Sequence, residues 1–182
     1  AFMPFYDLHM HTAASIGENT LEEMASFASK LGIAGIGIVQ YYSGTVEDVQ
    51  KMEGIDAVNC IMLKPNSAQE LNDVAGRVRN KCEILMVHGG DYEINRAACE
   101  NSVIDVLCHP ELGRRDSGLD HVCMKAAADN EVAIEVNFRE VLESYKIKRT
   151  YVLSAMKKNI KLARKYGANT VTTSGAVTKW GM

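Results

Sequence analysis

Two histidines separated by one residue, His9 and His11, are the first residues of this sequence that could do chemistry. They fall in a segment that predicts a strand over residues 5–11, and alternate side chains of a strand share a face, so Asp7, His9 and His11 should point the same way. Neutral imidazole nitrogens are preferred ligands of zinc and related metals. The spacing therefore predicts the start of a hydrolytic metal site, which would need further ligands from later strands.

The elements that would position such a site alternate regularly along the chain. Six further strands are expected over residues 34–40, 57–64, 83–88, 103–109, 132–137 and 170–174. Amphipathic helices are expected over residues 20–31, 45–53 (the weakest), 67–80, 91–101, 117–130 and 150–166. Repeated strand–helix units of this kind predict a parallel sheet with helices outside it.

Polar residues gather at the carboxyl ends of the predicted strands. They are His9, His11, Gln40, Lys64, His88, His109, Glu135, Asn137 and Ser174. A polar residue at the end of every strand fits a closed ring, whereas an open sheet binds ligands mainly at one switch point. No G-x-G-x-x-G follows the first strand, so a dinucleotide fold has no support. The expected fold class is α/β: a TIM-like (β/α) barrel of about seven parallel strands.

Composition sets the broad class of the protein. The chain has 182 residues, of which 47% are apolar and 24% are charged, values that are typical of a globular protein. No run approaches the roughly 18 apolar residues that span a bilayer, and no signal peptide precedes the first strand. Five cysteines without a C-x-x-C pair indicate reduced, mostly buried thiols. A cytoplasmic protein without membrane contacts is the expectation.

The net charge of −3 hides a strong asymmetry. Residues 139–182 contain ten Lys/Arg and two Asp/Glu, a net +8, whereas residues 1–138 contain ten and twenty-one, a net −11. Such polarity suggests a polyanion or an acidic partner at one end of the molecule. An ordinary solvated helix face is the simpler alternative.

The predicted helix over 150–166 is the clearest candidate for a basic surface. Its apolar stripe is expected at Leu153, Met156, Ile160 and Ala163. Its other side carries Lys157, Lys158, Lys161, Arg164 and Lys165. Clustered cations of this kind resemble an electrostatic footprint for RNA, and nearby Tyr145, Tyr151 and Tyr166 could stack on unpaired bases. The alternative is that these tyrosines belong partly to the core.

Four other arginines are candidates for contacts with RNA. Arg96 opens a helix after Gly89-Gly90 and would contact a phosphate or pair with a carboxylate. Arg114 and Arg115 lie in a loop after the fifth strand, where they suit RNA backbone contacts. Arg139 would either reach Glu135 or Asp7 in a buried ion pair or contact RNA.

A family resemblance becomes specific at this point. Asp7 to Thr12 (DLHMHT) looks like the first motif of the polymerase-and-histidinol-phosphatase (PHP) superfamily, whose fold is a seven-stranded barrel. More narrowly, the chain resembles the archaeal and eukaryotic ribonuclease P protein component 3 family, the thirty-kilodalton subunits. The matching motifs are residues 87–91 (VHGGD), 94–97 (INRA), 105–111 (DVLCHPE), 115–122 (RDSGLDHV), 132–140 (VAIEVNFRE), 173–176 (TSGA) and Trp180.

The resemblance also shows where this sequence departs from an active PHP enzyme. An Asp-His pair is expected after the second strand, where this chain has Gln40-Tyr41, and an Asp-x-His after the last strand, where it has Gly175 and Val177. His9, His11 and His109 are therefore vestigial metal candidates. We expect no catalytic residue in this chain, no cofactor bound by it, and a polar network in place of the metal.

The resemblance implies a subunit of ribonuclease P, the ribonucleoprotein endonuclease that removes the 5′ leader from precursor tRNA. The catalytic RNA with its Mg²⁺ performs the cleavage, and the chain binds and stabilises that RNA together with other small protein subunits. The RNA-binding candidates are Arg96, Arg114, Arg115, Lys157, Lys158, Lys161, Arg164 and Lys165. The expected domain is a single barrel over residues 1–182 that lacks the family's C-terminal helix. The alternatives are a metal-dependent phosphoesterase and a protein-interaction barrel without RNA contacts.

Overall fold

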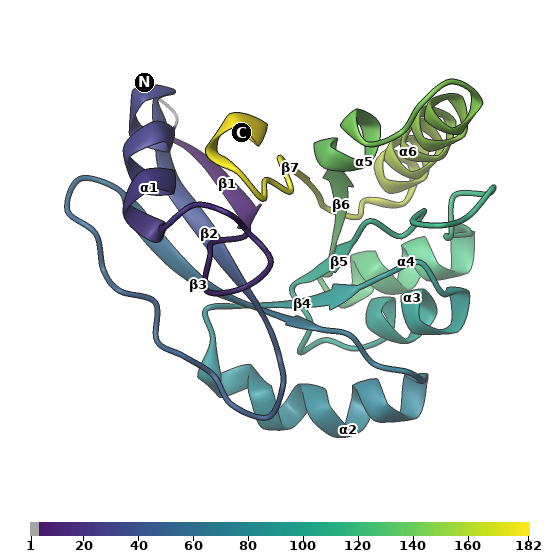
Figure 1. The fold of residues 1–182 in the computed structure, drawn as a ribbon. Coiled ribbons are helices and arrows are strands. Elements are labelled where there is room, and N and C mark those ends of the chain that lie inside the picture. The colour runs from purple at the N-terminus through teal and green to yellow at the C-terminus, as the bar shows by residue number, and fades with distance from the viewer. Residues whose placement is uncertain (1–3) are drawn as a thin grey trace.

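The computed structural model describes residues 4–182, which form seven strands and six α-helices (Figure 1). The strands are β1 (Phe5–Met10), β2 (Ile33–Tyr41), β3 (Asp56–Leu63), β4 (Ile84–His88), β5 (Val106–Cys108), β6 (Ala133–Asn137) and β7 (Thr170–Thr173). The helices are α1 (Leu21–Lys30), α2 (Ala68–Val78), α3 (Tyr92–Cys99), α4 (His121–Asp129), α5 (Phe138–Leu142) and α6 (Ile147–Tyr166). Two short 3₁₀ turns, η1 (Arg79–Lys81) and η2 (Lys179–Gly181), complete the description.

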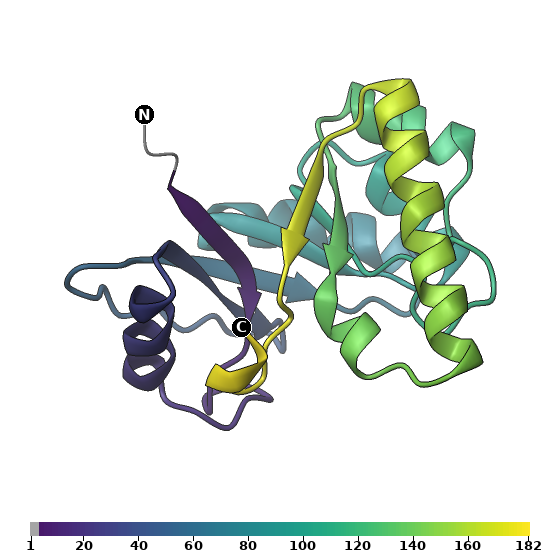
Figure 2. The same ribbon diagram turned by 90° about the horizontal axis from the view of Figure 1, so that it is seen from above.

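The strands form one sheet in the order of the sequence, and every neighbouring pair is parallel. The sheet curls until β1 and β7 meet at their carboxyl ends and diverge at their amino ends (Figure 2). One backbone bridge joins Met10 and Ala176, with a 2.8 Å hydrogen bond from the His11 N–H to the Ala176 carbonyl, and the Ser174 N–H donates to the Asp7 carboxylate at 3.1 Å. The predicted seven-stranded parallel barrel is confirmed, and it is nearly closed.

The core has an inner and an outer layer because side chains alternate along each strand. Cys60, Met62, Met86, Val106 and Cys108 pack together inside the barrel. The intervening strand residues pack outward against α2, α3, α4 and α6; among them are Ile61, Leu63, Leu85, Val87, Leu107 and Ile134. Glu135 and Asn137 continue the inward alternation of β6, so the register alone carries these polar groups into the barrel mouth.

Helix starts follow from side-chain caps that satisfy free backbone N–H groups. Thr20 and Glu23 form a capping box at α1, and Asp91 accepts from two backbone N–H groups at α3. Both starts agree with the sequence prediction. Asp120 caps α4, so this helix begins at residue 121 and not at the predicted residue 117.

Two elements differ from the prediction. Residues 45–53 do not form a helix; they lie along β2 as an irregular segment, held by hydrogen bonds of the Gln40 side chain to the Glu47 backbone. The short helix α5 was not predicted, because the Asn137 side chain ends β6 and caps the next turn through the Arg139 N–H. At five residues, α5 is too short to give a clear apolar period.

Gly118 fixes the loop that leads into α4. Its φ is +70°, and a Cβ at this position would lie 2.0 Å from the Pro110 carbonyl oxygen. We expect Gly118→Ala to lower the free energy of unfolding by roughly 2–4 kcal/mol, from a disfavoured φ together with overpacking. Gly32→Ala is the matched control, because Gly32 has a φ of +78° but open space around it. Urea unfolding of both variants checks this, and equal losses would contradict the packing argument.

Candidate functional site

A buried pair between His9 and Glu135 lies at the centre of the barrel mouth. His9 comes from β1 and Glu135 from β6, and the His9 Nδ1 lies 2.5 Å from the Glu135 Oε1. Both side chains are almost fully buried. Two residues that are 126 positions apart in sequence meet here because the barrel brings its first strand close to its sixth and seventh.

Both carboxylate oxygens of Glu135 have protein partners. Oε1 also accepts a 2.6 Å hydrogen bond from the Thr173 hydroxyl. Oε2 accepts from the backbone N–H of His109 at 2.9 Å and from the Asn137 amide at 3.4 Å. The carboxylate is therefore engaged by four protein groups and joins β1, β5, β6 and β7.

Burial and neighbouring charges shift the pKa values of His9 and His11 in opposite directions. Burial alone would lower the pKa of His9, but the adjacent Glu135 carboxylate outweighs this and raises it. Burial, the charge of His9 and that of Arg139 lower the pKa of His11 to about 3. The carboxylate thus favours the protonated form of His9, in which Nε2–H donates to the neutral His11 Nε2 at 3.1 Å. In that form the positive charge of the site is carried by a side chain.

The donors that lie close together are too few to hold a metal ion tightly. Among residues 4–182, the one group of three potential ligands with donor atoms within 4.8 Å of each other is His9, Cys108 and Glu135. Both oxygens of Glu135 are occupied, and burial raises the pKa of Cys108 far above the usual range of a thiol. His109 takes no part in this group, although its ring lies 4.4 Å from that of His88 between centroids. Of the three predicted metal candidates, His9 and His11 lie together in the mouth. His109 contributes its backbone N–H, which donates to Glu135.

The residues in place of the expected ligands have other tasks. The Gln40 side chain turns away from the mouth toward Glu47 and Asn59, whereas the Tyr41 ring stacks on His11 with centroids 5.8 Å apart. Gly175 has a φ of +64°, and a Cβ there would lie 2.3 Å from the Asn137 side chain. A ligand side chain at position 175 would therefore collide with Asn137.

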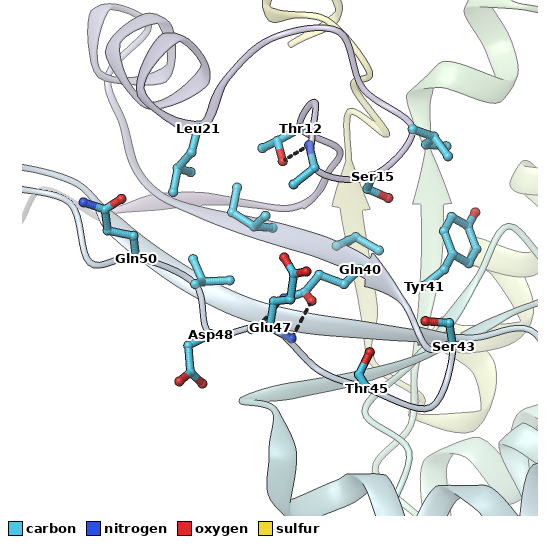
Figure 3. Close-up of a pocket in the computed structure, with 15 residues that line it drawn as sticks. Thr12, Ser15, Leu21, Gln40, Tyr41, Ser43, Thr45, Glu47, Asp48 and Gln50 are labelled. Carbon is cyan, nitrogen blue, oxygen red and sulfur yellow. Dashed lines mark hydrogen bonds between the residues drawn. The ribbon is translucent and has the colours of Figure 1, made fainter.

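A hollow of about 480 Å³ lies beside β2, outside the barrel mouth (Figure 3). The loop after β1 and the 43–50 segment form its walls, and dashed lines in Figure 3 mark the bond that ties Glu47 to Gln40. Its carboxylates, Glu47 and Asp48, are exposed. An acidic hollow of this kind does not suit a phosphate.

The α6 helix separates its cations from its packing face. The buried residues are Val152, Ala155, Met156, Asn159 and Ala163. Of the predicted apolar stripe, Met156 and Ala163 are buried and Ile160 is partly buried, whereas Leu153 is half exposed. Lys157, Lys158, Lys161, Arg164 and Lys165 are all exposed. With 3.6 residues per turn, these five fall within about a third of the circumference, opposite the buried face. We call them the α6 basic face.

Three of the four arginines that were predicted to contact RNA form ion pairs within the described structure, and the fourth does not. Arg96 pairs with Glu100 at 2.8 Å, and Arg114 chelates Asp116 and donates to the Gly90 carbonyl. Arg115 is exposed and has no ion pair with any residue in the described part of the chain. Arg139 pairs with Glu143 at 2.6 Å, so the predicted pairing with Glu135 or Asp7 was wrong.

Exposed aromatic and aliphatic residues surround the turn between α5 and α6. Tyr145 is 72% exposed and Ile147 68%, on either side of Lys146, whose φ is +50°. Tyr151 is also exposed, whereas Tyr166 packs partly against the core. Of the three predicted stacking residues, two are therefore accessible.

Glu111 is a buried carboxyl that the sequence reading did not single out. It lies 3% exposed after β5, and neither oxygen has a hydrogen-bond partner among the described residues. Burial raises its pKa from 4.5 to about 7. The only signal in the sequence was its place in the motif His109-Pro110-Glu111.

Glu111→Gln should therefore stabilise the fold in a pH-dependent way. The folded-state pKa lies above the unfolded one, so wild-type stability falls as the pH rises from about 4.5 to about 7 and the burial cost is complete above that. Glutamine carries no charge, so its gain over wild type should grow across this window to roughly 2–3 kcal/mol. Urea unfolding at pH 4.5, 6 and 8 measures this, and a gain that does not depend on pH would contradict it.

Every helix within residues 4–182 is too short or too polar to span a lipid bilayer.

Comparison with known proteins identifies the relatives of this chain. A family model described as "RNase P subunit p30" matches residues 4–182. Ribonuclease P protein component 3 of Methanococcoides burtonii is 39% identical over 181 residues, covering 98% of this chain and 73% of the relative. The same protein of Methanosarcina acetivorans is 37% identical over 178 residues, covering 96% and 73%.

Solved structures agree with this assignment. A chain of archaeal ribonuclease P, determined with mature tRNA, superposes with a TM-score of 0.79 at 30% identity, covering 96% of this chain and 76% of that one. A putative histidinol phosphatase of Listeria monocytogenes has a TM-score of 0.68 at 12% identity, covering 97% of both chains, and shares the fold alone. The chain belongs to the RNase P subunit p30 family.

Proposed function

We propose that this chain is a protein subunit of ribonuclease P, which removes the 5′ leader from precursor tRNA. In this role it binds and stabilises the catalytic RNA together with other small protein subunits, and the RNA with its Mg²⁺ performs the cleavage. The observation that carries the proposal is the likeness, over 96% of this chain, to a chain of archaeal ribonuclease P with mature tRNA. The mouth supports it, because its carboxylate is fully engaged by protein groups.

The RNA contacts are proposed for the α6 basic face together with Arg115. These side chains are exposed, and the face points away from the barrel. Arg114 and Arg96 are weaker candidates, since each already pairs with a carboxylate. Phosphate contacts release counterions, so affinity for ribonuclease P RNA should fall steeply with salt. Equilibrium binding between 50 and 200 mM salt tests this; a flat dependence would favour the protein-interaction barrel.

A metal-dependent phosphoesterase is the second candidate, and the H-x-H pair of β1 favours it. His11→Ala distinguishes the two functions, because His11 would be a ligand of the metal but is a neutral acceptor in the network. We expect the particle reconstituted with this variant to retain nearly all its precursor-tRNA cleavage. Thermal unfolding controls for folding. A collapse of cleavage by a folded variant would support the metal-dependent function.

The remaining expectations stay predictions. We propose that the barrel acts as a single domain; residues 1–3 lie outside the described structure. A cytoplasmic location is likewise proposed. Fractionation of cells that express a tagged chain would test it.

A further inference from the structure

A small cavity lies between the loop after β5 and the start of α6. Its volume is about 220 Å³, and it is lined by Glu111, Arg115, Glu140, Lys148, Tyr151 and neighbouring residues. This is below the roughly 300–1,000 Å³ of typical small-molecule sites. It therefore has room for part of a ligand, with the remainder on the rim. We call it the Glu111 pocket.

The wall of this pocket contains an unsatisfied acceptor. Glu111 is 3% exposed, and neither of its oxygens has a hydrogen-bond partner among residues 4–182. Glu135, which is buried to a similar degree, has partners for both oxygens. Buried polar groups are almost always hydrogen-bonded, so the two free oxygens of Glu111 call for a donor from outside the chain.

The rim of the pocket has the opposite character. Arg115 and Lys148 are exposed there, and neither forms an ion pair with any residue that the structure describes. Tyr151 is 43% exposed and lines the same pocket. The ligand should thus carry hydrogen-bond donors at one end, a planar apolar surface, and negative charge at the other end. An unpaired nucleotide of RNA has all three.

We propose that the Glu111 pocket binds an unpaired guanine base of RNA, an inference that rests on the RNA-binding function proposed above. The N1–H and N2–H of guanine are adjacent donors, and they match the two acceptor oxygens of the ionised Glu111 carboxylate. Tyr151 stacks on the base, and Arg115 and Lys148 contact the flanking phosphates. Adenine and uracil would direct a ring or carbonyl acceptor at the carboxylate, which opposes their binding.

A protein partner is the competing occupant of this region. Leu142, Tyr145 and Ile147 are exposed at the adjacent α5–α6 turn, and clustered apolar side chains are typical of protein interfaces. The two unpaired cations within the pocket outnumber the rim carboxylate of Glu140, and together with the unpartnered Glu111 they favour the nucleotide. The experiment below separates the two occupants.

The test is fluorescence anisotropy with the full chain and three labelled pentanucleotides. Each has uridine at the outer positions and guanine, inosine or adenine in the centre. A bidentate contact predicts that the guanine oligonucleotide binds at least about fivefold more tightly than the adenine one. Inosine, which lacks the N2 amino group, should fall between them.

Three variants assign this preference to the pocket. Glu111→Gln should abolish the guanine preference without changing the salt dependence, and thermal unfolding verifies its fold. Tyr151→Leu should weaken all three oligonucleotides alike through lost stacking. Glu143→Gln is the matched control, because Glu143 is an exposed carboxylate at the adjacent α5–α6 turn that does not line the pocket. It should leave the preference unchanged.

The contrary outcomes are distinguishable. Equal affinities for the three oligonucleotides, or no binding of any by a chain that does bind ribonuclease P RNA, would overturn the pocket and leave the RNA-binding role intact. Loss of ribonuclease P RNA binding as well would overturn both. If the Glu111 and Tyr151 variants bind oligonucleotides as wild type does but assemble poorly with purified partner subunits, the surface is a protein interface and the guanine proposal is wrong.

Discussion

Replacing Glu135 with alanine is expected to lower the free energy of unfolding by about 3–5 kcal/mol, the usual cost of removing one partner of a buried ion pair. The His9 imidazolium loses its counterion, and the Thr173 hydroxyl and the His109 N–H lose their acceptor. Urea unfolding at pH 7 measures the effect. Glu143→Ala is the control, because it removes an exposed carboxylate paired with Arg139 and should cost at most about 1 kcal/mol.

A double-mutant cycle sharpens this prediction. Once Glu135 is absent, His9 has no buried partner, so His9→Ala together with Glu135→Ala should cost clearly less than the sum of the two single changes. Strict additivity would show that the two side chains do not interact in solution. A cost of Glu135→Ala no larger than that of Glu143→Ala would show that the mouth is not held together by this carboxylate.

Neutralising Lys157, Lys158 and Lys161 together is expected to produce the largest change in RNA binding. Each phosphate contact contributes about 1 to the slope of log affinity against log salt, so the triple change to glutamine should lower the slope by about 3. Affinity at 50 mM salt should fall at least about tenfold. The folding cost should be small, because the three side chains are exposed on α6, opposite its buried face.

The matched control changes three exposed lysines in the acidic part of the chain. Lys30, Lys51 and Lys81 lie outside the α6 basic face, and their replacement by glutamine alters the net charge equally. If RNA binding depends only on net charge, the two triple variants will lose the same affinity. An unchanged slope for the α6 variant would exclude that face from the RNA contact.

The sequence was sufficient to predict the barrel because two periodicities dominate it. Apolar runs of strand length alternate with amphipathic helices, and the polar residues occur where the strands end. Residues 45–53 were wrongly predicted as a helix. Hydrogen bonds from the Gln40 side chain fix their conformation, and no local sequence pattern shows that contact. Helix α5 was not predicted, because its start depends on capping by the Asn137 side chain and not on an apolar periodicity.

The site was predictable in its residues but not in its connections. The H-x-H pair and Glu135 were visible as polar side chains at strand ends, yet their pairing depends on closure between β1 and the last two strands. Arg139 was expected either to pair with Glu135 or Asp7 in the mouth or to contact RNA; it pairs with Glu143 one helical turn away, which excludes the first alternative. Glu111 was overlooked because its significance comes from burial without a partner, a property of the packed structure.

The most direct test of the account is cleavage of precursor tRNA at limiting Mg²⁺ by the catalytic RNA and its other protein subunits, with and without this chain. We predict stimulation only in the complete mixture and no phosphoesterase turnover by the isolated chain with Zn²⁺ or Mn²⁺. Absence of stimulation, combined with turnover by the isolated chain, would mean that the barrel mouth is an active site and that the account is wrong.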